Sequence, residues 1–268
     1  MVKGEKISPA FKAGGHRAGA PWCRCRLFFI TWILMSTQKS LENSPDNSDV
    51  NKRVRVCALV DGFNMYHSLD GFDRGGPLGY AKYQKYKWLC LASLAKKFLT
   101  ANEILGSIKY FTAFPNWDPA KLLRHETYVS AQRYYGVEVI KGEFRNKRVV
   151  CRADGGCKRE FVIKIEKQTD VNIAVSIIKF APLFDKLLLF TGDSDQIPAV
   201  KLFKHLYREK RIGVVIPIGR NAEELAAECD EAYRIEEQHL IDSQLPNPIE
   251  VVRNGKVVSR ILKPTTWP

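Results

Sequence analysis

The chain has 268 residues, of which 45% are hydrophobic and 26% are charged, a composition typical of a globular protein and not of a disordered or fibrous one. Its 42 Lys and Arg against 29 Asp and Glu give a formal net charge of +13, which favours polyanionic partners such as nucleic acids. The seven cysteines are scattered and odd in number, which argues against a disulfide framework, so we expect a cytoplasmic protein.

The first part of the chain, residues 1–50, differs in composition from the rest. Its apolar run at 27–35, LFFITWILM, is too short to span a bilayer, so we expect no membrane segment. No small-residue cleavage site follows the run, as a signal peptide would require. We expect translation to begin at Met35 and residues 1–50 to form a disordered extension that contributes nothing to the fold.

From residue 55 onward, short apolar runs alternate with segments of helical periodicity. Strands are expected at 55–60, 104–114, 137–142, 186–192, 212–219 and 232–235. Helices are expected at 81–99, 118–135, 170–181, 194–210 and 221–229. Asp118 and Thr169 are placed as N-caps of their helices. This alternation predicts a three-layer α/β/α sandwich with a mainly parallel, Rossmann-like sheet over residues 51–243.

Residues 244–268 are expected to form a C-terminal tail outside that domain. The tail is Pro-rich at first and then reads VVRNGKVVSRIL. Asn254 and Gly255 favour a tight turn between two strands, which predicts a small hairpin there.

Several aspartates follow predicted strands. Asp61 ends the first strand, Asp193 and Asp195 follow the strand at 186–192, and Asp170 begins the helix before that strand. Ligands of such sheets bind at the carboxyl ends of the strands, so these acids are expected to converge there. Converging carboxylates repel one another unless cations neutralise them, and Mg²⁺ or Mn²⁺ takes such oxygen ligands. Singly, Asp61 and the Asp193–Asp195 loop are equally consistent with turns, and Asp170 alone is better explained as the complement of a helix N-terminus.

Three segments together resemble the signature blocks of a known family. They are VDGFNMY at 60–66, EKQTDVNIAVSII at 166–178 and LLLFTGDSDQIPAVK at 187–201, and they are similar to those of NYN domains, PIN-like nucleases that include the LabA-like proteins. The resemblance runs from residue 55 to 241. It implies a PIN-like fold and an Mg²⁺- or Mn²⁺-dependent ribonuclease. The residues that it implies are the catalytic, metal-binding Asp61, Asp170 and Asp193, with Asn64, Thr191 and Ser194 in supporting roles. Asp195 is a supporting polar group and a further candidate metal ligand.

The sequence departs from the PIN-like pattern in one respect, because no motif marks the further acid that such sites often carry on an intervening helix. Glu103 and Glu126 are available for that place, and Asn64, Asn172 or Glu166 are the alternatives. With three strong ligands, the site is consistent with one metal ion as well as with two.

The segment between the first two acidic motifs is basic. Between residues 141 and 167, nine Lys or Arg stand against four acids, with Phe144 and Phe161 among them. Such a segment favours RNA, because aromatic rings stack on bases. The candidate contacts are Lys141, Arg145, Lys147, Arg148, Arg152, Lys158 and Arg159. A solvated hairpin explains the same composition. Cys151 and Cys157 lack a second Cys or His pair nearby, so zinc is not expected.

The sequence therefore predicts a metal-dependent endoribonuclease acting on single-stranded RNA. The alternative is a PIN-like module that binds RNA without cutting it. A HAD-like phosphatase is disfavoured because position 63, where that chemistry needs a second aspartate, is Phe. His67 is expected on a helix surface and not in catalysis, and the sequence leaves a homodimer open.

Overall fold

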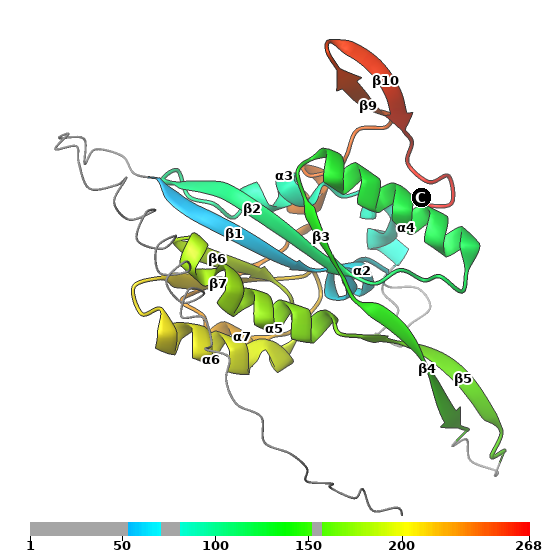
Figure 1. The fold of residues 1–268 in the computed structure, drawn as a ribbon, viewed down its shortest axis with the longest axis horizontal. Coiled ribbons are helices and arrows are strands. Elements are labelled where there is room, and N and C mark those ends of the chain that lie inside the picture. Colours follow the sequence, from blue (N-terminus) through cyan, green and yellow to red (C-terminus); the bar gives the residue numbers. More distant parts are fainter. Residues whose placement is uncertain (1–52, 71–80, 152–156) are drawn as a thin grey trace, which may run out of the picture. The chain divides into compact units, whose positions relative to one another are not determined.

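The computed structural model describes residues 53–70, 81–151 and 157–268. The predictions made for residues 1–50 and for Arg152 lie outside these ranges. A parallel six-stranded sheet forms the centre, in the order β3-β2-β1-β6-β7-β8 (Figure 1). Its strands are β1 (Val54–Asp61), β2 (Glu103–Thr112), β3 (Glu138–Lys141), β6 (Lys186–Phe190), β7 (Arg211–Ile216) and β8 (Glu231–Arg234).

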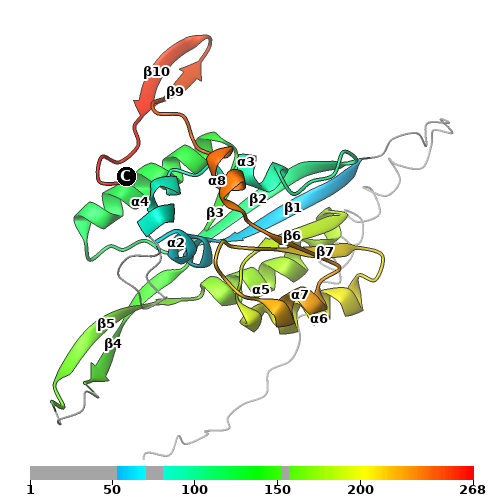
Figure 2. The ribbon, with the colours of Figure 1, turned by 180° about the vertical axis from the view of Figure 1, so that it is seen from behind.

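Helices cover both faces of the sheet, as the two views show (Figures 1 and 2). They are α2 (Gly62–Asp70), α3 (Leu91–Lys96), α4 (Pro119–Tyr134), α5 (Thr169–Phe180), α6 (Ile197–Leu206), α7 (Glu223–Glu228) and α8 (Glu237–Ile241). The 3₁₀ helices are η2 (Ala81–Tyr86), η3 (Ala181–Leu183) and η4 (Ser194–Gln196). None of the described helices is long and apolar enough to cross a membrane.

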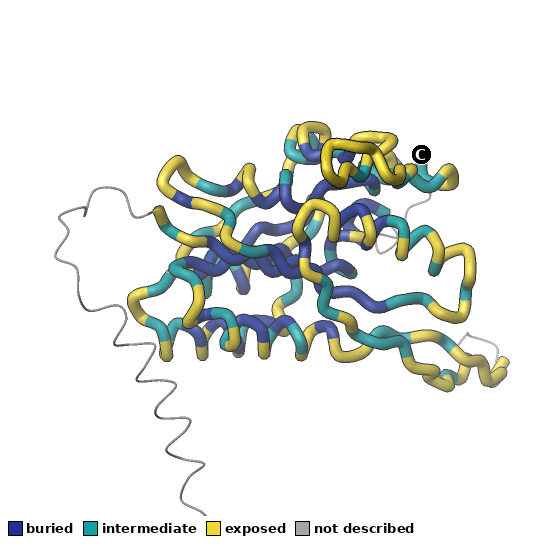
Figure 3. The backbone as a smooth tube through the Cα atoms, turned by 45° about the horizontal axis from the view of Figure 1, so that its top comes forward, coloured by how far each residue is buried: buried dark blue, intermediate teal, exposed yellow. Residues whose placement is uncertain are grey.

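Strand β1 supplies both hydrophobic cores, because side chains alternate between the faces of a strand. Val56, Ala58 and Val60 join the core beneath α3 and α4. Cys57 and Leu59 join the core beneath α5 and α6. The central strands are accordingly the most buried part of the described chain (Figure 3), and the predicted three-layer architecture is confirmed.

Two antiparallel hairpins lie outside the central sheet. Strands β4 (Glu143–Val150) and β5 (Glu160–Lys167) pair with each other and extend away from the sheet (Figures 1 and 2). Strands β9 (Ile249–Arg253) and β10 (Lys256–Ile261) turn at Asn254 and Gly255, both with positive φ. The chain around this second hairpin also packs on the domain, since the rings of Trp267 and Trp88 lie 6.2 Å apart.

The predicted helix at 81–99 is wrong as a single element. It forms η2, an extended stretch and the short α3. Tertiary hydrogen bonds interrupt it: the Cys90 N–H donates to the Ser243 carbonyl and the Leu91 N–H to the Gln132 side chain. Periodic apolar residues continue across this break because both parts are buried, so periodicity alone does not reveal it.

The two predicted N-caps have different outcomes. Asp118 caps α4 as predicted, accepting a hydrogen bond from the Lys121 N–H at 3.0 Å. Thr169 is wrong as a cap, because it is the first residue of α5 and the cap position is Gln168 with φ 78°. The Thr169 hydroxyl donates to Glu166 instead.

Candidate metal centre

The topological switch of the sheet lies between β1 and β6. From β1 the strand order runs through β2 and β3 on one side and through β6, β7 and β8 on the other. At such a point the connecting loops diverge and leave a crevice at the carboxyl ends of the strands. Asp61 is the last residue of β1, and Thr191 to Asp193 directly follow β6.

Asp61 is almost fully buried, with 2% of its surface exposed. Its carboxylate accepts hydrogen bonds from the Asn64 N–H at 3.0 Å, the Asn64 amide at 2.9 Å and the Thr191 hydroxyl at 2.9 Å. Burial raises the pKa of Asp61 above its ordinary value, these hydrogen bonds oppose the rise, and the negative charge of Asp193 adds to it. Asp61 is therefore a carboxylate held in one orientation.

Asn64 and Thr191 tie the two strand ends together. The Asn64 side-chain Oδ1 accepts a hydrogen bond from the Gly192 N–H at 3.2 Å, while its Nδ2 donates to Asp61. The Thr191 hydroxyl donates to Asp61 and accepts from the Asp193 N–H at 3.1 Å. Two short polar side chains thus fix the loop after β6 against the end of β1.

Gly62 is required by close packing at this point. A Cβ there would lie 2.5 Å from the Phe111 carbonyl oxygen and 2.8 Å from the Tyr110 ring. The Asp61-Gly62 pair is therefore not a solvent-exposed turn. Helix α2 begins at Gly62, and this glycine packs against β2.

Asp170 belongs to the same electrostatic group. It lies in the first turn of α5, where the helix dipole favours a negative charge. The pKa of its carboxyl is nevertheless raised to about 6, first by partial burial and then by the charges of Asp61, Asp193, Glu166 and Asp195. Mutual repulsion thus links these acids, although they come from separate segments of the chain.

The loop after β6 orders the remaining acids. The Asp193 side chain accepts from the Asp195 N–H at 3.0 Å and caps η4. Ser194 and Asp195 are exposed. Gln196 is 1% exposed, and its amide donates to the Asp170 carbonyl at 3.4 Å. Its Oε1 atom has no hydrogen-bond partner among the described residues.

Glu103 and Glu126 do not supply the further acid. Glu103 begins β2 at the opposite edge of the sheet and pairs with Lys186, and Glu126 is exposed on α4. Glu166 is closer to the group, because its charge contributes to the raised pKa of Asp170. Asn172 donates to the Lys141 carbonyl at 3.3 Å.

The donor chemistry of this edge suits a hard divalent cation. Carboxylate oxygens and a buried amide oxygen without a partner are ligands of the kind that Mg²⁺ and Mn²⁺ take. In the described ranges, no group of three or more His, Cys, Asp or Glu side chains is arranged to hold a metal ion. Mg²⁺ keeps several of its waters and needs only one or two carboxylates directly, so the residues present fit such an ion.

The predicted RNA contacts divide between the two faces of the β4–β5 hairpin. Side chains of directly paired residues share a face, so Arg145 and Lys147 lie with Ile165 and Ile163. Arg148 lies on the other face, with Val162. Lys158 and Arg159 are exposed beside β5, and Lys141 lies 4.6 Å from the Phe114 ring. The segment is a hairpin with basic residues on both faces, a geometry that is consistent with RNA contact as well as with a merely solvated hairpin.

Sequence reasoning missed the aromatic residues that follow β2. The carboxyl end of β2 lies beside that of β1, so Phe114 and Trp117 follow the same edge as Asp61. His67, expected on a helix surface, is half-buried and lines a cavity beside α2. The strand order, which the sequence does not state, was the missing information.

Comparison with known proteins places this geometry in a family. A crystal structure of a protein of unknown function from Vibrio parahaemolyticus is similar with a TM-score of 0.48 and 21% identity, covering 74% of this chain and 100% of that one. No curated protein matches. The NYN domain family matches residues 55–236. The chain therefore belongs to the NYN domain family, a family of PIN-like nucleases.

Proposed function

We propose that this chain is a divalent-metal-dependent endoribonuclease that hydrolyses single-stranded RNA, with Asp61, Asp170 and Asp193 as the metal-holding acids. The observation that carries the proposal is that acids from β1, α5 and the loop after β6 share one electrostatic group. None of the ion pairs among the described residues includes these acids. Such a group is costly unless a cation neutralises it.

The chain's own residues have distinct parts in the proposed mechanism. Asp61 is held by Asn64 and Thr191 and presents a fixed carboxylate, while Asp193 and Asp170 approach from the loop after β6 and from α5. Asp61, Asp170 and Asp193 would hold Mg²⁺ or Mn²⁺, and the chemistry supplied by the bound ion would be a water activated for attack on phosphorus and compensation of charge on the leaving oxygen. Asp195 and Ser194 are exposed at the rim, where they suit an outer position near metal-held water or phosphate.

The basic hairpin supports RNA as the substrate. Its exposed cations, with the chain's net charge of +13, favour a polyanion and speed its approach. The cytoplasmic location, the homodimer and the restriction to single strands remain predictions from the sequence.

One observation favours a second candidate, an RNA-binding module that does not cut. The described acids do not form a ready group of three metal ligands. Such a module would retain the fold and the basic hairpin while its acids hold no catalytic ion.

Cleavage of labelled single-stranded RNA by the full chain decides between the two candidates. We expect cutting with Mn²⁺ or Mg²⁺ and none with EDTA. Asp193→Asn is expected to lower the rate by more than about 100-fold, because even an outer-shell partner of a metal site contributes about 10- to 100-fold. A circular RNA substrate separates endonucleolytic from exonucleolytic action, since only an endonuclease opens the circle.

The matched control is Asp185→Asn. Asp185 is a partly buried aspartate just before β6, paired with Arg55 at the opposite edge of the sheet, so neutralising it should leave cleavage unchanged. Equal cleavage by Asp193→Asn and wild type would overturn the assigned site. RNA binding without cutting, in every metal tested, would favour the non-cutting module.

A further inference from the structure

A cavity of about 570 Å³ lies beside the acidic edge, and nothing in the proposed mechanism uses it. Helix α2 forms one wall, the segment from the end of β2 into α4 forms another, and the base of the β4–β5 hairpin closes a third side. Cavities of this size hold small organic ligands, with a few polar groups fixing their orientation.

Aromatic rings from three separate segments meet at this cavity. Phe144 of β4 lies 4.5 Å from the Trp117 ring and 5.5 Å from the Phe63 ring, in edge-to-face arrangements. Trp117 is 40% exposed, so part of its ring is accessible to a ligand. Edge-to-face rings offer flat faces on which a planar group stacks, and nucleobases stack on aromatic side chains irrespective of sequence.

Cations stand among the lining residues of the same cavity. Lys164 lies 5.4 Å from the centre of the Trp117 ring. Lys121 and Arg124 project from the first turns of α4, and Arg124 has no ion pair within the described part of the chain. Such groups neutralise phosphates. The lining cations outnumber the lining acids, which are Asp70 and Glu166, so a planar aromatic group that carries negative charge suits the lining.

Neutral polar groups are also present in the lining. His67 Nδ1 is buried and has no hydrogen-bond partner among the described residues. His125 Nε2 lies 3.0 Å from the Thr112 hydroxyl, and burial lowers the pKa of His125 to about 4, so its ring is neutral at pH 7. Neutral rings and hydroxyls suit the uncharged edges of a base, while an unpaired buried nitrogen is costly unless a ligand or water satisfies it.

Two sets of residues relate the cavity to the acidic edge. Gly62 and Phe63 line it and directly follow Asp61. Glu166 lines it from β5, and its charge acts on Asp170. A base inside the cavity would therefore place its own backbone phosphate toward the acids.

We infer that this cavity is a nucleobase pocket, in which one unpaired base of the RNA strand stacks against Trp117 and Phe144 next to the cleavage site. The inference rests on the proposed function for its choice of polymer. It gives a physical reason for the proposed preference for an unpaired strand, since a base within a duplex cannot enter a cavity without leaving its stack.

The test compares the affinity of the full chain for a short single-stranded RNA with that for a ribose-phosphate polymer of equal length that lacks bases. Both are measured in EDTA by fluorescence anisotropy, so that no cutting occurs. Wild type should prefer the RNA by about 10-fold, the order expected for stacking one base on an aromatic side chain. The ratio cancels the contribution of the phosphates, and with it any general change in charge or folding.

Trp117→Ala and Phe144→Leu should each remove most of that preference. Phe161→Ala is the matched control, because Phe161 is an exposed phenylalanine on the same hairpin that shares a face with Val149, opposite the face of Phe144, and does not line the cavity. It should keep the wild-type ratio. An unchanged ratio in both cavity variants, or no preference in wild type, would overturn the pocket.

Cleavage by the same proteins in Mn²⁺ is scored separately. If wild type cuts RNA in the presence of metal but shows no preference for bases, the proposed nuclease function is supported and the nucleobase pocket is contradicted. A base preference that depends on Trp117 and Phe144, without cutting in any metal, would support the pocket and overturn the nuclease.

Discussion

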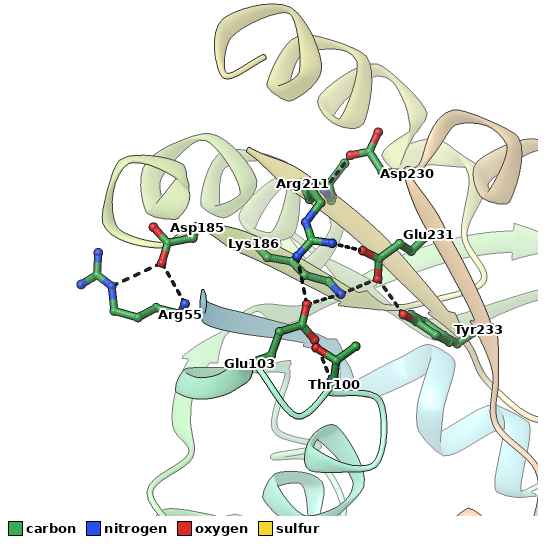
Figure 4. Close-up of polar contacts among 10 residues, drawn as sticks. Arg55, Thr100, Glu103, Asp185, Lys186, Arg211, Asp230, Glu231 and Tyr233 are labelled. Atoms are coloured by element: carbon green, nitrogen blue, oxygen red, sulfur yellow. Dashed lines mark hydrogen bonds and ion pairs between the residues drawn. The ribbon is translucent and has the colours of Figure 1, made fainter. Parts of the chain in front are cut away.

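The arrangement of charged side chains differs between the amino ends and the carboxyl ends of the central strands. At the amino ends of the strands, the Lys186 side chain is fully buried and lies 3.0 Å from Glu103, with Glu231 as its second partner (Figure 4). Arg211 pairs with both glutamates, at 3.2 and 3.0 Å. Burial alone would raise the pKa of Glu103, but hydrogen bonds from the Thr100 N–H and Lys186 outweigh it, so the pKa falls below its ordinary value.

At the carboxyl ends, the acids have no such partner within the described part of the chain. The pKa values of Asp61 and Asp170 are raised, by burial first and by neighbouring acids after it. One edge therefore pairs its acids with its own cations, whereas the acids of the other form no ion pair within the described part of the chain and fit a cation from solution. A paired buried charge is a structural device, and an unpaired acidic group at a ligand crevice indicates function.

Removing the central cation of the paired edge has the largest expected effect on stability. Lys186→Met leaves Glu103 and Glu231 with Arg211 alone and should lower the free energy of unfolding by about 3 kcal/mol, measured by urea denaturation. The control is Lys201→Met, since Lys201 forms an exposed pair with Glu228 and its loss should cost less than about 1 kcal/mol. Equal effects of the two changes would break the contrast between the edges.

Loss of the Thr191 hydroxyl has the next largest effect. Thr191→Val removes the 2.9 Å hydrogen bond to the buried Asp61 carboxylate and should lower the free energy of unfolding by about 2 kcal/mol in EDTA. Thr127→Val is the control, because within the described ranges the Thr127 hydroxyl bonds only to the Leu123 carbonyl of its own helix. If both variants unfold at the same urea concentration, Thr191 does not hold Asp61.

Neutralising an acid of the unpaired edge should stabilise the protein when metal is absent. Asp170→Asn is expected to raise the free energy of unfolding in EDTA at pH 7 by about 1 kcal/mol, a figure that allows for solvent screening of an exposed residue.

The sign of its pH dependence follows from the raised pKa. The folded protein holds the Asp170 proton up to about pH 6, whereas the ordinary value is 3.8. The stabilising effect of that proton is complete below the ordinary value and lost as the pH rises through about 6. The gain from Asp170→Asn should therefore be present at pH 7 and vanish near pH 4. A gain that does not change with pH would contradict this origin.

The sequence predicts the strands and the acidic edge because both depend on local pattern. The continuous apolar runs at β1, β6 and β7 are long enough to be recognised as strands buried on both faces, and chain order places Asp61 and Asp193 at their carboxyl ends. The Asp118 cap of α4 is equally local, since donor and acceptor are three residues apart.

What could not be predicted depends on contacts between distant residues. The break between η2 and α3 is set by hydrogen bonds to Gln132 and Ser243. Glu103 is not a metal ligand because it pairs with Lys186, which is 83 residues away in the sequence. The aromatic cavity brings together Phe63, Trp117 and Phe144, which are neighbours only after the strands are ordered. No local pattern contains this information.

Unfolding by urea in EDTA and in excess Mn²⁺, for wild type and Asp193→Asn, tests most directly whether the acidic edge is a cation site. A ligand that binds only the folded state stabilises it by about 2.7 kcal/mol at 100 times its dissociation constant. We expect a gain of this order for wild type and little or none for Asp193→Asn. No gain for wild type, or equal gains for both proteins, would contradict a metal site at Asp193.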